Sequence, residues 1–245
     1  MKHLVEIKKE VTSNWFKSLQ DKIIFQFQLL ENEISRENKK KSKKFIKREW
    51  RKKNKKEGGG TSYLLSGGEL FDKVGVNQST VSGQFEKTFR SKILGAKKNG
   101  KYWASGISVV AHMKNPKIPA FHFNTRFITT SKEWFGGGID ATPSSKDTRE
   151  ELIIHQKLKK ICLLNLKDYN KYKKWCDNYF YLPHRKEPRG IGGIFFDYET
   201  KNWEKNFKFV QDLGIGFIDI TKQIIINKKK LKWNDKDKVQ QLYKR

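Results

Sequence analysis

The chain has 245 residues, enough for one large domain or two small ones, and its 36% hydrophobic and 13% aromatic content excludes a disordered chain. Lys and Arg total 53 against 26 Asp and Glu, and the net charge of +27 indicates an anionic partner: nucleic acid, an acidic membrane surface or a polyanionic small molecule. No apolar run reaches the roughly 18 residues of a membrane span, no secretory signal opens the chain, and Cys162 and Cys176 form neither a disulfide framework nor a zinc-ligand spacing, which together favour a soluble protein of a reducing cytoplasm.

The first predicted element is a helix over 14–34, where apolar residues recur every three or four positions and Ser13 or Asn14 can cap the N-terminus. The segment 39–56 follows and holds twelve Lys or Arg. It is a candidate nucleic-acid patch, but a solvated segment in a lysine-rich chain explains it better, because an RNA-binding segment more often carries Arg and a fold signature. Residues 74–83 then alternate as a short strand does.

The middle of the chain is rich in predicted strands. Residues 102–112 and 119–129 predict two antiparallel strands, joined by a loop with an Asn-Pro turn signal. Residues 193–198 predict a third strand. The glycine run 136–138 allows close approach of the backbone and is expected to end the strand before it.

Predicted helices follow the strands. One begins at an Asp147 cap and runs to about residue 164, and two more cover 171–181 and 203–213. Strands first and helices later, with short connections, indicate a single α+β domain with a largely antiparallel sheet.

Alternation along 119–129 separates an apolar face from a polar one. His122, Asn124 and Arg126 share one face, whereas phenylalanines and Thr125 share the other. An ordinary solvent face remains an alternative, but an imidazole, an amide and a guanidinium in a row are more specific than solubility requires. We therefore interpret this face as a candidate site.

The neighbouring strand leaves room for a ligand above that face. One face of this strand carries small residues, followed by Ser108 and His112. In a hairpin pairing, His112 can lie beside His122. Two such imidazoles can bind a metal, share a proton or hydrogen-bond within the protein, and their spacing does not decide. Asp140, after the glycine run, is either a turn residue or a carboxylate in a cleft that accepts a proton or a ligand N–H.

Two further histidines lie outside these strands. His155 borders the apolar stripe of its predicted helix, which favours a structural role. His184 lies in a basic loop together with Arg185 and Arg189, and the planar guanidinium of either arginine can bind carboxylates.

Long and specific sequence motifs cover 106–197. They read Gly-Ile-Ser-Val-Val-Ala-His at 106–112, His-Phe-Asn-Thr-Arg-Phe at 122–127, Trp-Phe-Gly-Gly-Gly-Ile-Asp-Ala-Thr-Pro at 134–143, Tyr-Lys-Lys-Trp-Cys-Asp-Asn-Tyr-Phe-Tyr at 172–181 and His-Arg-Lys-Glu-Pro-Arg-Gly-Ile-Gly-Gly-Ile-Phe-Phe-Asp at 184–197. With weaker similarity over 15–77, these motifs make the chain resemble the aerobic, oxygen-dependent coproporphyrinogen III oxidases of heme biosynthesis.

The resemblance implies a broad antiparallel sheet covered by helices on both faces, in one domain over 1–245 that acts as a cytoplasmic homodimer. It implies that two propionates of coproporphyrinogen III become vinyls, with dioxygen as co-substrate and protoporphyrinogen IX, carbon dioxide and hydrogen peroxide as products. No flavin or heme is expected, and a divalent metal cation is often described for bacterial members. These partners disfavour nucleic acid as a ligand.

The resemblance also implies roles for particular residues. The matching positions are His122 and Asp140 for catalysis, Ser108, Asn124, Thr125 and Arg126 for substrate binding, and His112, His122, His155 and His184 for the proposed metal.

The sequence departs from the family pattern in places. Ala141 replaces a usual leucine, and Ser144 and Ser145 replace a more aromatic continuation. Family members continue beyond 241–245 into segments that carry strands, a catalytic Asp and Arg pair, a substrate-binding Arg and dimer contacts. We therefore expect a C-terminally truncated copy. The alternatives are an impaired member that at most binds tetrapyrrole, and a basic nucleic-acid-binding protein.

Overall fold

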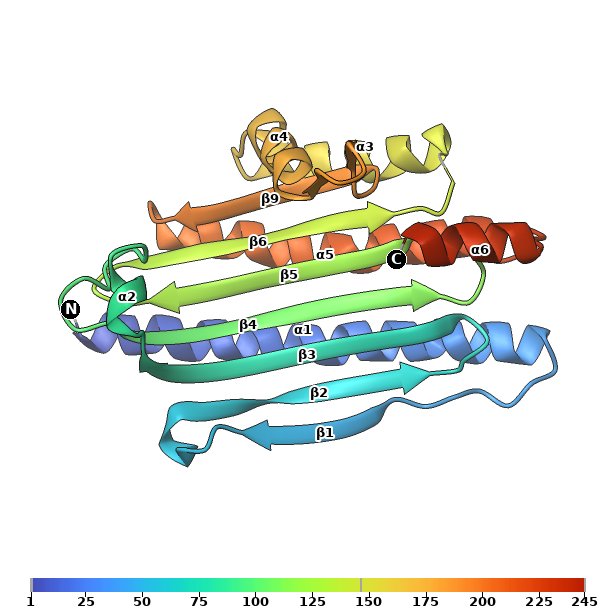
Figure 1. Ribbon diagram of the computed structural model, residues 1–245. Helices are drawn as coiled ribbons and strands as arrows, with labels where there is room; N and C mark the ends of the chain where they lie inside the picture. The colour runs from blue at the N-terminus through green and yellow to red at the C-terminus, as the bar shows by residue number, and fades with distance from the viewer. Residues whose placement is uncertain (1, 146, 245) are drawn as a thin grey trace.

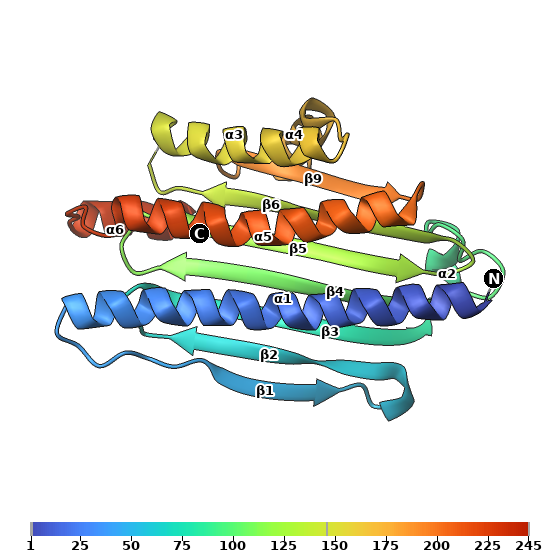
Figure 2. The ribbon, with the colours of Figure 1, turned by 180° about the vertical axis from the view of Figure 1, so that it is seen from behind.

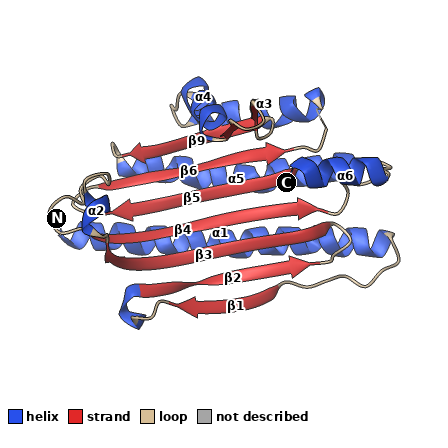
Figure 3. Cartoon of the chain, viewed as in Figure 1, coloured by secondary structure: helices blue, strands red, loops and turns tan. Residues whose placement is uncertain are grey.

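The computed structural model describes residues 2–145 and 147–244. Its centre is a seven-stranded sheet in which every neighbouring pair is antiparallel (Figures 1 and 3). In spatial order the strands are β1 (Ile46–Arg51), β2 (Gly58–Ser66), β3 (Phe71–Gln84), β4 (Lys101–Met113), β5 (Ala120–Thr129), β6 (Glu133–Thr142) and β9 (Gly192–Glu199). A small hairpin pairs β7 (Tyr181–Leu182) with β8 (Glu187–Pro188).

Two long helices, α1 (Lys2–Glu37) and α5 (Trp203–Lys228), lie side by side across one face of the sheet (Figure 2). Helix α3 (Thr148–Leu164) packs beside α5, and α4 (Tyr169–Tyr179) packs on the edge strand β9. The opposite face, which we call the open face, carries α6 (Asp235–Lys244) at one end and the short α2 (Lys87–Arg90) at the other (Figure 1). One turn of 3-10 helix covers Lys55–Glu57.

An aromatic core joins the sheet to α1 and α5. Phe27 of α1, Phe71 of β3, Phe123 of β5 and Phe217 of α5 are each at most 2% exposed, and the Phe123 and Phe217 rings stack with centroids 4.8 Å apart. Burying four aromatic side chains together stabilises the helix–sheet interface strongly. The sheet is therefore a rigid platform for side chains on its open face.

The α+β class and the antiparallel sheet are confirmed, and α1 and α5 cover one face of it as expected. In the described residues the other face carries only α6 and α2, at its two ends. Strands predicted over 102–112, 119–129 and 193–198 appear as β4, β5 and β9, and Asp147 caps α3 by accepting from the backbone N–H groups of Arg149 and Glu150. No helix in the described ranges is long and apolar enough to cross a membrane.

Three predicted boundaries are wrong. Helix α1 begins at Lys2, well before the predicted start. Ser13 is therefore inside the helix, where its hydroxyl donates to the Glu10 carbonyl and does not cap an N-terminus. Helix α5 continues to Lys228 on an unbroken apolar stripe. The glycine run 136–138 does not end its strand but lies inside β6, for reasons given below.

Candidate active site

The site is built on the open face of β4, β5 and β6. Along β5 burial alternates strictly, so His122, Asn124 and Arg126 lie on the open face while Phe123 and Thr125 lie in the core. The predicted separation of a polar from an apolar face is confirmed.

Register brings the motif residues into rows across the sheet. Asn124 pairs with Ser108 of β4 on one side and with Gly138 of β6 on the other. His122 pairs with Asp140 of β6. Residues far apart in the chain therefore form a compact set, which the strand pairing fixes without any loop.

The glycines of β6 keep this face flat. A Cβ on Gly136 would lie 2.3 Å from Oδ1 of Asp197, and one on Gly138 would lie 2.8 Å from the Ile194 carbonyl. Both distances are far below van der Waals contact, so only glycine leaves room for the Asp197 side chain and for the Ile194 carbonyl of the neighbouring strand β9. The glycines are thus needed for close packing within the strand.

Asp140 is held between an arginine and a histidine. Nη2 of Arg189 donates to Oδ1 and Oδ2 of Asp140 at 2.8 and 2.7 Å, and the guanidinium lies over the Phe180 ring at 3.8 Å. On the other side, Nδ1 of His122 is 3.4 Å from Oδ2 of Asp140. That nitrogen is buried and makes no hydrogen bond in the described residues, so a small rotation of the imidazole brings it into hydrogen-bond range of the carboxylate.

His112 and His122 are neighbours, as predicted. Val110 is directly opposite His122 in the register, so His112 lies on the diagonal, with the two ring centroids 6.2 Å apart and the rings nearly perpendicular. Both imidazoles line a small cavity of about 90 Å³ beneath Gln241 and Lys244 of α6.

The main cavity beside Asp140 has a volume of about 320 Å³. Its floor is the sheet, and its wall is formed by three aromatic rings, in which Tyr179 stacks on Phe195 at 4.3 Å and Phe180 lies edge-on to Tyr179. The polar groups that converge on it are those of Ser108, His122, Asn124, Arg126, Asp140 and Arg189. An apolar wall with a few placed polar groups is the usual composition of a small-molecule site.

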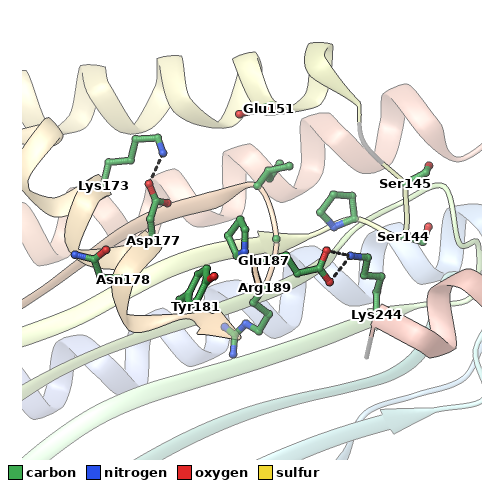
Figure 4. A pocket seen from close by; sticks show the side chains of 14 residues that line it. Ser144, Ser145, Glu151, Lys173, Asp177, Asn178, Tyr181, Glu187, Arg189 and Lys244 are labelled. Carbon is green, nitrogen blue, oxygen red and sulfur yellow. Dashed lines mark hydrogen bonds and ion pairs between the residues drawn. The ribbon is translucent and has the colours of Figure 1, made fainter. Parts of the chain in front are cut away.

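A third cavity, of about 520 Å³, is lined by the segment that carries Arg189, by residues of α4 and by Lys244 (Figure 4). Its two lysines are both paired with carboxylates, Lys173 with Asp177 at 2.6 Å and Lys244 with Glu187 at 2.8 Å. Arg189 borders this cavity as well, but its guanidinium is bound to Asp140. We place the reactive site in the 320 Å³ cavity, because the polar face of β5 and Asp140 line that cavity and do not line the 520 Å³ one.

Thr125 is the exception among the predicted substrate-binding residues. Its side chain is fully buried on the core side of β5, where its hydroxyl has no hydrogen-bond partner in the described residues. A ligand on the open face can reach only its backbone.

The four histidines predicted to bind a metal do not come together. Nε2 of His155 lies 2.9 Å from the Ile191 carbonyl and its Nδ1 lies 2.7 Å from the Tyr169 hydroxyl, so both ring nitrogens have protein partners. His184 is exposed in the turn between β7 and β8. Among the described residues no group of three or more His, Cys, Asp or Glu is arranged to hold a metal ion. These residues do not fit the expected metal within one chain.

Sequence reasoning missed Asp197 and the aromatic wall. Nη2 of Arg126 donates to Oδ2 of Asp197 at 2.6 Å, across the width of β6. The one available signal was that Asp197 lies two residues after Phe195 in a predicted strand and so shares its face. Arg189 was expected to bind a carboxylate, and the carboxylate it binds here is Asp140 of the chain itself.

Comparison with known proteins gives one consistent result. The sequence profile of the family described as coproporphyrinogen III oxidase matches residues 11–245. Proteins named oxygen-dependent coproporphyrinogen-III oxidase from Rickettsia bellii (strain OSU 85-389) and Rickettsia akari (strain Hartford) are each 47% identical over 239 residues, and the one from Rickettsia typhi is 48% identical over 240 residues. Each alignment covers 97% of this chain and 85% of the relative.

Proposed function

The chain belongs to the coproporphyrinogen III oxidase family, and we propose that it converts coproporphyrinogen III to protoporphyrinogen IX in heme biosynthesis with dioxygen as the oxidant. In each of two steps a propionic acid side chain loses carbon dioxide and two hydrogens and becomes a vinyl group. Dioxygen takes up the two electrons and two protons and leaves as hydrogen peroxide, so atoms and electrons balance.

The observation that carries this proposal is the Arg189–Asp140–His122 arrangement beside the main cavity. The substrate presents pyrrole N–H groups, and Asp140 presents a carboxylate that is only 4% exposed and is fixed by two hydrogen bonds from one guanidinium nitrogen. The guanidinium keeps this carboxylate ionised and fixed, so its remaining lone pairs can accept a hydrogen bond from a pyrrole N–H. Movement of the pyrrole proton toward Asp140 makes the ring more electron-rich toward dioxygen.

His122 is placed to move a proton at the same point. Its Nδ1 faces Asp140, and its ring borders both cavities of the open face. We assign His122 the role of donating a proton to reduced dioxygen, and Asp140 the role of orienting the His122 ring.

The polar row of the floor binds the substrate in this proposal. Arg126 offers a planar guanidinium to a propionate, and Asn124 and Ser108 offer hydrogen bonds in the same row of the sheet. The aromatic wall of Tyr179, Phe180 and Phe195 suits the apolar edge of a tetrapyrrole.

Three wider features belong to this proposal through the family. They are a homodimer, a cytoplasmic location, which the two unpaired cysteines favour, and a divalent cation at the His112–His122 pair. The cation requires ligands beyond the His112–His122 pair, because His155 is engaged elsewhere. Metal analysis of the purified protein tests this part separately.

The test is turnover of coproporphyrinogen III by the purified chain, in air and under argon, with product separation by chromatography. We expect protoporphyrinogen IX in air only. Asp140→Asn keeps the shape of the side chain but removes the base, and it should lower kcat by a factor of about 100 or more. Equal turnover by this variant, or turnover under argon, contradicts the proposal.

A further inference from the structure

We propose that Asp197 is a positioning residue for Arg126, which holds one edge of the guanidinium so that the other N–H groups face a substrate carboxylate. This inference rests on the proposed function, in which Arg126 binds a propionate. It adds Asp197, the last residue of the 184–197 motif, for which the resemblance implies no role.

The first observation is that Arg126 is held at two points. Its Nη2 donates to Oδ2 of Asp197 at 2.6 Å and its Nη1 donates to Oδ1 of Asn124 at 3.0 Å. A guanidinium has five N–H groups, so three remain for a ligand. Two fixed contacts on a long, flexible side chain remove the rotamer freedom that binding would otherwise have to restrict.

The second observation is that the sheet is shaped for this ion pair. Arg126 is opposite Gly136 in the β5–β6 register, and the β6–β9 register shifts between Phe135 and Gly137, at the level of Gly136. A Cβ at Gly136 would lie 2.3 Å from Oδ1 of Asp197 and 3.2 Å from Nε of Arg126. The Arg126–Asp197 ion pair therefore lies directly above Gly136 of β6, where the side chain of any other residue would push the pair apart.

The third observation is backbone strain next to Asp197. Tyr198 has φ +56°, which a bulky residue rarely adopts, and its N–H donates to Oδ1 of Asp197 at 2.9 Å. Its ring stacks on Trp134 with centroids 5.6 Å apart, and this packing holds the backbone in place. Both oxygens of Asp197 are thus engaged, one by its own strand and one by Arg126, so the carboxylate is fixed before Arg126 binds it.

Two substitutions break this arrangement in different ways. Asp197→Asn retains the shape but replaces one of the two accepting oxygens with an NH2 group, so either the Tyr198 N–H or Arg126 faces a donor in place of its acceptor. Gly136→Ala leaves both partners present and pushes the end of the Asp197 side chain aside, without a clash against backbone. Because positioning acts on binding, each should raise KM for coproporphyrinogen about tenfold with kcat changed less than about twofold.

Matched controls exist for both. Asp212→Asn removes a carboxylate that pairs with Lys208 on α5, on the opposite face of the sheet. Gly75→Ala adds a methyl group to the open face of β3, where the nearest atom is Nδ2 of Asn77 at 3.7 Å. Neither control should change KM.

The experiment is steady-state kinetics of these four variants and of the Asp197→Asn/Gly136→Ala double variant. We expect the double variant to have the KM of either single one, because both break the same contact. If Asp197 only neutralises Arg126, Asp197→Asn frees a positive charge and lowers KM, and this result overturns the inference. An unchanged KM, or additive effects, also overturns it. Absence of turnover in the unmodified chain instead refutes the proposed function itself, so the two failures are distinguishable.

Discussion

Arg189→Met tests whether the Arg189–Asp140 pair holds the site together. The substitution keeps an apolar side chain over Phe180 but removes the only guanidinium that donates to Asp140 in the described residues. Asp140 is 4% exposed, so it would be left as a buried carboxylate without a cationic partner. Breaking a buried ion pair costs about 3–5 kcal/mol, and the partial exposure of Arg189 places this case near the lower value.

A loss of about 3 kcal/mol corresponds to a fall in Tm of about 6–12 °C for a chain of this size. Thermal and urea unfolding followed by circular dichroism at pH 7 measure it. The matched control is Arg185→Met, on the other side of β8. Arg185 also lies over an aromatic ring, that of Tyr243, but donates to a backbone carbonyl and not to a carboxylate. It should cost less than about 1 kcal/mol.

The double variant Asp140→Asn/Arg189→Met measures the coupling between the two residues. It removes the unpaired charge, so it should be clearly more stable than the sum of the two single effects predicts. Additive losses, or a loss below about 1 kcal/mol for Arg189→Met alone, would show that the pair does not hold Asp140 in place.

Three further predictions concern Thr125 beneath the site and two residues of α3. Thr125→Val should leave KM unchanged and raise stability by up to about 1 kcal/mol, because it replaces a buried hydroxyl without a partner by a methyl group; a higher KM would show that the side chain contacts substrate after all. His155→Phe should lower stability by about 1–3 kcal/mol, since Tyr169 and the Ile191 carbonyl lose their partner, and should leave the metal content measured by atomic emission unchanged. Burial raises the pKa of Glu150 to about 7, so the folded state binds this proton more tightly than the unfolded state, and Tm should fall as pH rises from about 5 to 7. In Glu150→Gln this fall in Tm should be absent from melting curves measured across the same pH range. A fall of equal size in the variant would be contrary to this assignment.

The sequence could predict the strands of the site because alternation is a local property. The alternation of apolar and polar side chains along β5 already separates the core side, with Phe123 and Thr125, from the open face, with Asn124 and Arg126. The loop between β4 and β5 fixes the pairing of these two strands closely enough to bring His112 near His122. The predicted end of the strand at Gly136 was wrong because glycine disfavours strands on average, while here it makes room for a side chain of β9.

The ion pairs could not be predicted in the same way. Arg126 and Asp197 are 71 positions apart, and Asp140 and Arg189 are 49 apart. Their meeting depends on which strand lies next to β6 and on a register shift, and neither leaves a periodic signal in the sequence. Thr125 shows the reverse case, in which alternation placed the side chain in the core and the family motif alone assigned it to substrate.

We propose that dioxygen is the electron acceptor for an oxidative decarboxylation on the open face. The decisive measurement is the dioxygen consumed, carbon dioxide released and hydrogen peroxide formed for each coproporphyrinogen III converted by the purified chain. We expect equal amounts of all three, two of each per protoporphyrinogen IX. Carbon dioxide release without dioxygen uptake, or no release at all by the folded protein, would refute this assignment.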